Sequence, residues 1–251
     1  MKLAVVGQNS PALAERLEAR GVALCAPADS DLLIPYGGDG TLLGAERDFP
    51  GVRKYPIRDE ETAPLCANHK LAIQLDALFA GQLKLSRIKR LKAEFDSAEI
   101  YAMNDIFIQN KNNATALRYK IWIDGELYSH EIVGDGVGVA TVHGSTAYFR
   151  SITHSVFRVG IGLAFSNSTE LVNHMILPET SEVRVKINRG PGEMVADNYT
   201  HPVLMQVGDE CRISLSREAS EFLGMDIFMC PECRRLRHEY RHSFFKPEGA
   251  E

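Results

Sequence analysis

Apolar residues recur along this chain with two different periods, and the change between them divides the sequence. The early runs Lys2–Gly7 and Asp31–Ile34 are almost continuously apolar, as expected for buried strands of a parallel sheet. A further strand is expected at Val22–Cys25. Between the first two strands, Ser10–Arg20 repeats apolar residues at helical spacing, and Asn68–Phe79 does so again later. Strands alternating with helices predict a parallel sheet covered by helices.

From about Arg87 onward, the pattern changes to short runs in which apolar and polar residues alternate, which predicts strands. Asp124-Gly125 predicts a tight hairpin turn between two of these runs. The basic segment at 84–95 is expected to be an edge strand, with a phosphate-binding patch as the alternative. The expected strands are Glu99–Gln109, Ala116–Ile123, Leu127–Val133, Val159–Phe165, Glu182–Ile187, Val203–Val207 and Cys211–Leu215. We therefore predict an α/β domain at 1–86, a β-rich, sandwich-like domain at 87–225, and a C-terminal tail at 226–251.

Composition narrows the class of protein further. The 251 residues carry a formal net charge of -5, so the chain as a whole has no positive charge that would attract a polyanion. A nucleic-acid partner is therefore not favoured. No apolar run is long enough to span a bilayer, and the start of the chain turns polar too early for a signal peptide. Five cysteines do not fit a secreted disulfide framework. We expect a cytoplasmic protein with free thiols and no membrane partner.

The first candidate for chemistry is a glycine-rich turn, PYGGDGTLL, that follows directly after an apolar strand. Gly37, Gly38 and Gly40 allow positive φ angles and a close approach of a ligand to the main chain around Asp39. A helix is expected from Thr41, and its free N–H groups would face an anion such as a phosphate. The alternative is that Asp39 only caps this helix. The turn is not a Walker loop, because no Gly-Lys-Ser/Thr follows.

A second glycine-flanked aspartate occurs in GDGVGVATVHGSTAY, where Asp135 precedes a short apolar strand. Ser145 and Thr146 offer hydroxyl and N–H groups, and a helix starting after Gly144 would add a second terminus for an anion or a ribose. Tyr148 can stack on a flat ring and still form a hydrogen bond.

A third feature is the pair Asn104 and Asp105, which interrupts an otherwise apolar strand. Neighbouring residues on a strand point to opposite faces, so at least one of these polar groups should meet the inner side of the sheet. A buried, unpaired amide or carboxylate costs on the order of a few kcal/mol, which favours a ligand as its partner. An ordinary turn is the alternative.

Together, Gly-Gly-Asp-Gly-Thr, the Asn-Asp pair, and Gly-Asp-Gly ahead of Gly-Ser-Thr-Ala-Tyr resemble the NAD kinase family, in the family's order. The pattern Ala80-Gly81 followed by Lys89-Arg90-Leu91 is shared as well. The resemblance implies a Rossmann-like N-terminal domain and a β-rich C-terminal domain. It also implies transfer of a phosphoryl group from ATP or polyphosphate to the 2′-hydroxyl of the adenosine ribose of NAD, and a homodimer or homotetramer.

Site roles follow from the same resemblance. Asp39 would be the general base, in a turn whose nucleotide-binding residues are Gly37, Gly38, Gly40 and Thr41. Asn104, Asp105 and Asp135 would contact the dinucleotide, and Ser145, Thr146, Ala147, Tyr148 and Ser151 would line its pocket. Mg²⁺ or another divalent cation would offset the charge of the triphosphate, and no residue is assigned as its ligand.

Several stretches depart from the family pattern, among them KYPIRDEETAPLC, Thr141-Val142-His143, RSITHSVFRVG and LAFSNSTELVN. Two alternative functions therefore stay open. One is a non-catalytic nucleotide-binding sensor. The other is a kinase with the same glycine-rich core that acts on a lipid or sphingoid base, against which the intact Gly-Ser-Thr-Ala-Tyr run argues.

Near the end of the chain, Cys230 and Cys233 form Cys-Pro-Glu-Cys, followed by His238 and His242. This spacing is compatible with zinc, although a single Cys-x-x-Cys is weak support. A basic helix end without metal is the favoured interpretation. Asp197 and Asn198 are expected in a hairpin rather than in catalysis.

Overall fold

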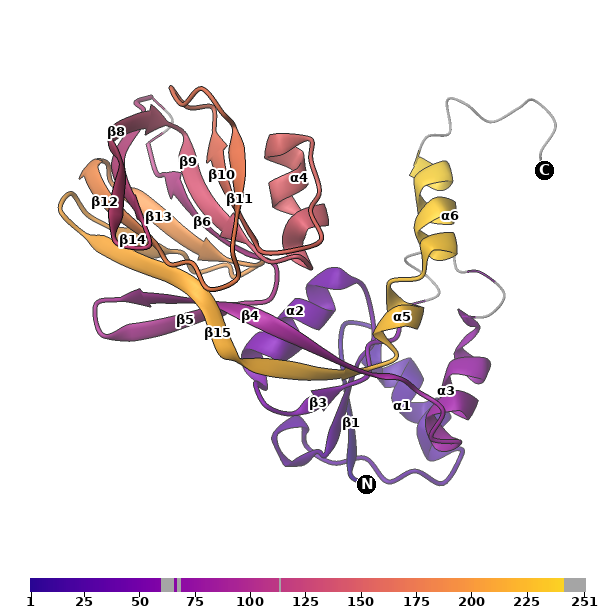
Figure 1. Cartoon of the computed structure of the whole chain (residues 1–251). Coiled ribbons are helices and arrows are strands. Elements are labelled where there is room, and N and C mark those ends of the chain that lie inside the picture. The colour runs from indigo at the N-terminus through magenta and orange to yellow at the C-terminus, as the bar shows by residue number, and fades with distance from the viewer. Residues whose placement is uncertain (60–65, 67–68, 113, 242–251) are drawn as a thin grey trace. The chain divides into compact units, whose positions relative to one another are not determined.

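The computed structural model describes residues 1–59, 66, 69–112 and 114–241, with the backbone alone over 237–241. The chain forms two compact units, one of Met1–Arg87 with Ser220–Glu251 and one of Ile88–Ala219. The predicted C-terminal tail therefore groups with the N-terminal unit. Two long strands, β4 (Leu85–Phe95) and β15 (Glu210–Leu223), pair with each other and carry the chain from one unit to the other (Figure 1).

The N-terminal unit is built on a parallel sheet. Strand β1 (Leu3–Val6) pairs with β2 (Leu32–Pro35), and β2 pairs with the short β3 (Arg53–Lys54). The far end of β15 adds a further parallel neighbour, with Phe222 opposite Lys54. The strand expected at Val22–Cys25 is wrong, because only a single bridge from Leu24 to Leu3 forms there.

Helices cover both faces of this sheet, because alternate residues of its strands point to opposite sides. Leu3, Leu32 and Ile34 pack with the leucines of α1 (Ser10–Glu18) and α3 (Leu71–Phe79). Ala4 and Leu33 pack on the other side with Ala45 of α2 (Asp39–Asp48). The same unit holds a 3-10 turn at Pro27–Asp29 and the C-terminal helices α5 (Met225–Phe228) and α6 (Pro231–Arg241). This arrangement confirms the Rossmann-like prediction.

The second unit consists of two antiparallel layers. In one layer, β7 (Leu117–Ile123) lies between β8 (Glu126–Gly134) and β12 (Val183–Arg189), and β12 pairs with β15. β5 (Ala98–Ala102) pairs with β4 beside them. The other layer has the order β11-β10-β9-β6-β13-β14. Its strands are β6 (Asp105–Asn110), β9 (Gly136–Ala140), β10 (Ile161–Ser166), β11 (His174–Leu177), β13 (Gly192–Ala196) and β14 (Val203–Met205).

One apolar cluster fills the space between these layers, with Ile121 and Val185 from the first and Ile106, Val137 and Leu163 from the second. The hairpin at Asp124-Gly125 is present between β7 and β8. The sandwich-like prediction is therefore confirmed. The 3-10 turn Gly144–Thr146 and α4 (Tyr148–Thr153) follow β9, as expected for the stretch after Gly144.

Three further expectations are wrong, two about where elements begin or end and one about the position of a strand in its sheet. Helix α2 begins at Asp39, two residues before Thr41, because Gly38 supplies its N-cap. The run Glu99–Gln109 breaks into β5 and β6, since the chain turns at Asn104. The segment 84–95 is a strand, yet it has both β5 and β15 as partners. No helix in the described part of the chain has the length and apolar character that crossing a membrane requires.

Candidate functional site

The glycine turn lies at the carboxyl end of β2, the edge of a parallel sheet where ligands of such folds bind. Gly37 has φ +156, and its N–H donates to the carbonyl of Ile57 at 2.9 Å. A Cβ on Gly37 would lie 2.4 Å from Oγ1 of Thr41, so the helix can fold back over the turn only with glycine there. Nothing lies within 4 Å of a Cβ built on Gly38, which leaves its backbone open to an approaching ligand.

Asp39 is the first residue of α2, and its side chain is 68% exposed. It is not the cap of the helix, because Gly38 holds that position. The carboxylate Oδ1 instead accepts a hydrogen bond from Nη2 of Arg58 at 2.8 Å. Asp39 therefore stands at the positive end of a ten-residue helix with one oxygen oriented by a cation.

Arg58 is itself held in place by the C-terminal segment of the same unit. Its side chain is only 7% exposed, its Nε donates to the carbonyl of Phe228 at 3.1 Å, and its guanidinium lies 4.0 Å from the centre of the Phe228 ring. A guanidinium fixed at two points and stacked on an aromatic ring has little freedom to move. Sequence reasoning missed Arg58, which lies in a stretch that departs from the family pattern.

In the second unit, the Asn104-Asp105 pair is held by one carboxylate. Asp197 accepts hydrogen bonds from the backbone N–H groups of Met103, Asn104 and Asp105 at 2.8, 2.7 and 3.2 Å. Asp197 has φ +51, as expected for a turn residue, and its own N–H donates to the carbonyl of Asp105 at 2.9 Å. The expected hairpin role of Asp197 thus includes fixing the backbone of the Asn-Asp pair.

The second glycine-rich stretch packs against the same pair. A Cβ on Gly144 would lie 2.1 Å from the carbonyl oxygen of Asn104, so only glycine allows this approach. The carboxyl of Asp105 accepts a hydrogen bond from the backbone N–H of Tyr148. Two of the three predicted motifs therefore meet within one unit.

Asp105 has an unusual environment. Its side chain is buried at 6% exposure, and among the described residues its Oδ2 has no hydrogen-bond partner. Burial, followed by the negative charge of Asp197, raises the pKa of Asp105 from 3.8 to about 7. A buried carboxyl with a free oxygen is a candidate ligand-binding group.

Asp135 and Tyr148 line a common cavity of about 360 Å³ in this unit. Oδ2 of Asp135 accepts a hydrogen bond from Nδ2 of Asn167 at 2.8 Å. The Tyr148 ring packs edge-on against Phe107, and its hydroxyl accepts from Nε2 of Gln109 at 3.1 Å. Tyr148 remains 40% exposed, so part of its ring is open for stacking.

A second cavity of about 510 Å³ adjoins the first and shares Tyr148, Ser166 and Asn167 with it. Ser151 lines this second cavity. The other predicted residues that follow Gly144 differ in solvent exposure: Thr146 is exposed, Ala147 is half-buried and Ser145 is buried. Asn167 is a further candidate that sequence reasoning missed, because its segment carries no recognisable motif.

The predicted residues thus form two groups, one in each unit. Gly37, Gly38, Asp39, Gly40 and Thr41 lie together at the sheet edge of the N-terminal unit. In the β-rich unit, Asp105 lies on β6 and Asp135 lies between β8 and β9. Tyr148 joins them, because its backbone N–H donates to Asp105 and its side chain shares a cavity with Asp135.

No family model matches the sequence. Among curated proteins, the chain is 28% identical over 204 residues to the NAD kinase of Clostridium beijerinckii, which covers 77% of this chain and 69% of the relative. It is 35% identical over 128 residues to the NAD kinase of Brucella melitensis, which covers 49% of each protein. The chain thus spans about two thirds of one relative and half of the other.

Among solved structures, the chain superposes on an NAD kinase from Archaeoglobus fulgidus, crystallised in complex with ATP, with a TM-score of 0.74. The superposition covers 96% of this chain and 99% of the other, at 19% sequence identity. At that identity the likeness establishes the fold, including the succession of a Rossmann-like unit and a β-rich unit.

Proposed function

We infer that this chain, a divergent member of the NAD kinase family, transfers a phosphoryl group from ATP to the 2′-hydroxyl of the adenosine ribose of NAD, giving NADP. The observation that carries this proposal is the Gly-Gly-Asp-Gly turn, with the exposed Asp39 at the start of α2 and at the carboxyl edge of a parallel sheet. A carboxylate beside a helix N-terminus supplies the two things that the reaction needs, a proton acceptor and a place for phosphate.

Asp39 accepts the proton of the 2′-hydroxyl while that oxygen attacks the γ-phosphorus of ATP. The new O–P bond forms as the bond from the γ-phosphorus to the bridging oxygen breaks, and ADP leaves with that electron pair. Arg58 orients the carboxylate through its bond to Oδ1, which leaves Oδ2 for the hydroxyl. The open backbone at Gly38 and the first N–H groups of α2 receive phosphate oxygens.

The β-rich unit contributes groups suited to the dinucleotide. Tyr148 offers a partly exposed aromatic face for the adenine, and Asp135 offers a carboxylate to ribose hydroxyls in the same cavity. The raised pKa of Asp105, about 7, keeps a share of this carboxyl protonated near neutral pH, so it can donate as well as accept a hydrogen bond. Asn104, Ser145, Thr146, Ala147 and Ser151 complete the proposed pocket.

The same proposal includes a divalent cation such as Mg²⁺ and assembly into a homo-oligomer, both supported by the family resemblance. A cytoplasmic location stays a prediction. Mg²⁺ binds chiefly to phosphate oxygens and water, so the triphosphate itself would hold the cation, and no residue of the chain is assigned as its ligand. When bound, the cation neutralises charge on the transferred group.

The test is to incubate the purified chain with ATP, Mg²⁺ and NAD and to measure NADP. Asp39→Asn should lower kcat by roughly 10²–10⁴-fold, the usual effect of losing a general base. Asp48→Asn is the matched control, since Asp48 is an exposed acid on the same helix that pairs with Arg47. Equal rates for wild type and Asp39→Asn would contradict the assignment of the base.

Two other outcomes separate the alternatives. Binding of ATP and NAD without any NADP formation would indicate a nucleotide-binding sensor, the alternative motivated by the stretches that depart from the family pattern. Phosphorylation of a sphingoid base or diacylglycerol, with no turnover of NAD, would indicate a lipid kinase.

A further inference from the structure

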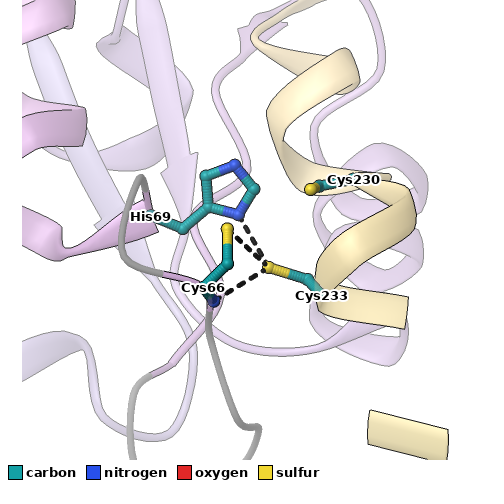
Figure 2. Close-up of side chains that lie close together, drawn as sticks. All are labelled: Cys66, His69, Cys230 and Cys233. Carbon is teal, nitrogen blue, oxygen red and sulfur yellow. Dashed lines mark hydrogen bonds between the residues drawn. The ribbon is translucent and has the colours of Figure 1, made fainter. Parts of the chain in front are cut away.

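Four side chains that the proposed reaction does not use converge in the N-terminal unit. Cys66 and His69 come from the segment before α3, and Cys230 and Cys233 come from the segment that starts α6 (Figure 2). One ligand atom from each residue lies within 4.8 Å of the other three. The two pairs are more than 160 residues apart in the chain, so their convergence is a product of the fold.

The distance between the Cys66 and Cys233 sulfurs fits two ligands of a common ion, whereas the shorter contact from Cys233 to His69 is a hydrogen bond that would lengthen when both atoms bind the metal. Sγ of Cys233 lies 3.6 Å from Sγ of Cys66 and 2.8 Å from Nδ1 of His69. Tetrahedral zinc, with Zn–S near 2.3 Å and Zn–N near 2.0–2.1 Å, places neighbouring ligand atoms roughly 3.5–3.8 Å apart. A disulfide would require about 2.05 Å between sulfurs. All five cysteines are free thiols, namely Cys25, Cys66, Cys211, Cys230 and Cys233.

The chemistry of the donor set points to the same metal. Three thiolates and one imidazole are soft ligands that select zinc over magnesium or calcium. The residues occur as Cys-x-x-His and Cys-x-x-Cys, the short spacing that lets both members of a pair reach one ion.

The cluster is also closed, as in structural zinc sites. Cys233 and His69 are buried, and Cys66 and Cys230 are half-buried. Four protein ligands leave no position for a substrate. The backbone at His69 is also held in place, because Nε2 of the buried Gln74 donates to the His69 carbonyl at 2.7 Å.

We propose that Cys66, His69, Cys230 and Cys233 bind one Zn²⁺ ion in a tetrahedral, structural site. The sequence pattern suggested Cys230 and Cys233 with His238 and His242, whose side chains lie outside the described residues. Cys66 and His69 take the two remaining positions instead.

The ion ties the C-terminal segment to the rest of the N-terminal unit. Phe228, whose carbonyl and ring hold Arg58, lies two residues before Cys230. Loss of zinc should therefore loosen the residue that orients Asp39, as well as the start of α6. The metal assay below is independent of the proposed kinase activity.

The first experiment measures metal content by elemental analysis of the full chain, produced with zinc in the medium and purified without chelators. We expect about one zinc per chain. Cys66→Ser and Cys233→Ser should each lose most of it, whereas Cys25→Ser, the matched control from outside the cluster, should keep it. Zinc well below one-tenth per chain, or the same zinc content in Cys233→Ser, would overturn the proposal.

The second experiment uses the wild-type chain, so it does not depend on whether a cysteine variant folds. After exchange of the metal for Co²⁺, we expect d–d absorption between about 600 and 750 nm with the intensity of a tetrahedral, sulfur-rich site. Thiol titration of the unfolded, chelator-treated chain should find all five cysteines reduced. Octahedral cobalt spectra, or only three reactive thiols as left by one disulfide, would overturn the zinc site.

Discussion

Nη2 of Arg58 donates to Oδ1 of Asp39 at 2.8 Å, and the two side chains differ sharply in exposure, at 7% and 68%. The guanidinium of Arg58 is buried and fixed in place, whereas the carboxylate of Asp39 is exposed to solvent. An ion pair with an exposed partner adds little stability. Its effect should therefore appear in the orientation of Asp39 and in the rate of the reaction.

Arg58→Lys should lower kcat by about tenfold with a smaller change in KM for NAD. Lysine keeps the charge but lacks the planar guanidinium, which donates to Asp39 and to the Phe228 carbonyl at the same time. Steady-state kinetics of NADP formation checks this. Arg53→Lys is the matched control, because Arg53 pairs with Glu221 at the surface of the same unit. A kcat equal to that of wild type would show that Arg58 does not position the base.

Tyr148→Ala should raise KM for NAD by about tenfold, since stacking of a base on an aromatic ring contributes roughly 1–3 kcal/mol. Tyr148→Phe keeps the ring, loses only the bond from Gln109, and should stay near wild type. Tyr199→Ala provides the control, as Tyr199 is also 40% exposed but does not line either cavity described above. Equal KM values for Tyr148→Ala and Tyr199→Ala would argue against stacking on Tyr148.

Asp105 should make the protein less stable as pH rises from about 4 to about 7. Its pKa is about 7 when folded and near 3.8 when unfolded, so over this window the folded state holds the extra proton. The stabilisation is complete below pH 4 and is lost as pH rises through 7. Asp105→Asn should remove this contribution, on the order of a few kcal/mol, from the pH dependence.

Urea unfolding of both proteins between pH 4 and 8 measures the effect as the difference in free energy of unfolding. Ser145→Ala, which alters a buried polar residue of the same unit that does not titrate, should shift stability equally at every pH. A difference between wild type and Asp105→Asn that is constant with pH would show that Asp105 is ionised in the folded chain.

A buried ion pair joins α2 to β3, with Lys54 at 0% and Glu46 at 4% side-chain exposure. Nζ of Lys54 also donates to the carbonyl of Phe49 at 2.7 Å, and the hydroxyl of Ser220 donates to Glu46. Lys54→Met should cost about 3–5 kcal/mol, because it leaves a buried carboxylate without its cation.

The double variant Lys54→Met with Glu46→Leu should recover most of that loss, since neither charge remains buried. Urea unfolding of the two single variants and the double variant completes a thermodynamic cycle. Additive losses in the double variant would show that the two charges do not interact.

Gly37→Ala should destabilise the chain by about 1–3 kcal/mol, because its methyl group would meet Oγ1 of Thr41 at 2.4 Å. Gly38→Ala should cost less, about 1 kcal/mol or below, since φ is -88 and the space around it is open, and alanine is only a poorer N-cap than glycine. The methyl at Gly38 should instead raise KM for ATP by blocking the backbone from a phosphate. Thermal unfolding and ATP kinetics distinguish the two variants, and equal losses of stability would contradict the role given to Gly37.

The sequence predicts the fold class, because the spacing of its apolar residues indicates which side chains are buried. It also contains the three glycine and asparagine motifs, which could be recognised because the residues of each motif are close together in the chain. It could not reveal Arg58, because the Phe228 carbonyl that fixes it is 170 residues away. Cys66 and His69 were hidden for the same reason, and the short strand β11 was missed because little of it is buried.

The N-terminal unit begins at Met1 yet closes its sheet with Phe222 of β15, beside Lys54. Every residue of the β-rich unit is therefore synthesised before the last four residues of β15, which complete the first sheet. On the ribosome, the β-rich unit can assemble from one uninterrupted segment while β3 still lacks its last neighbour. The order of translation thus makes the N-terminal unit the later of the two to finish folding.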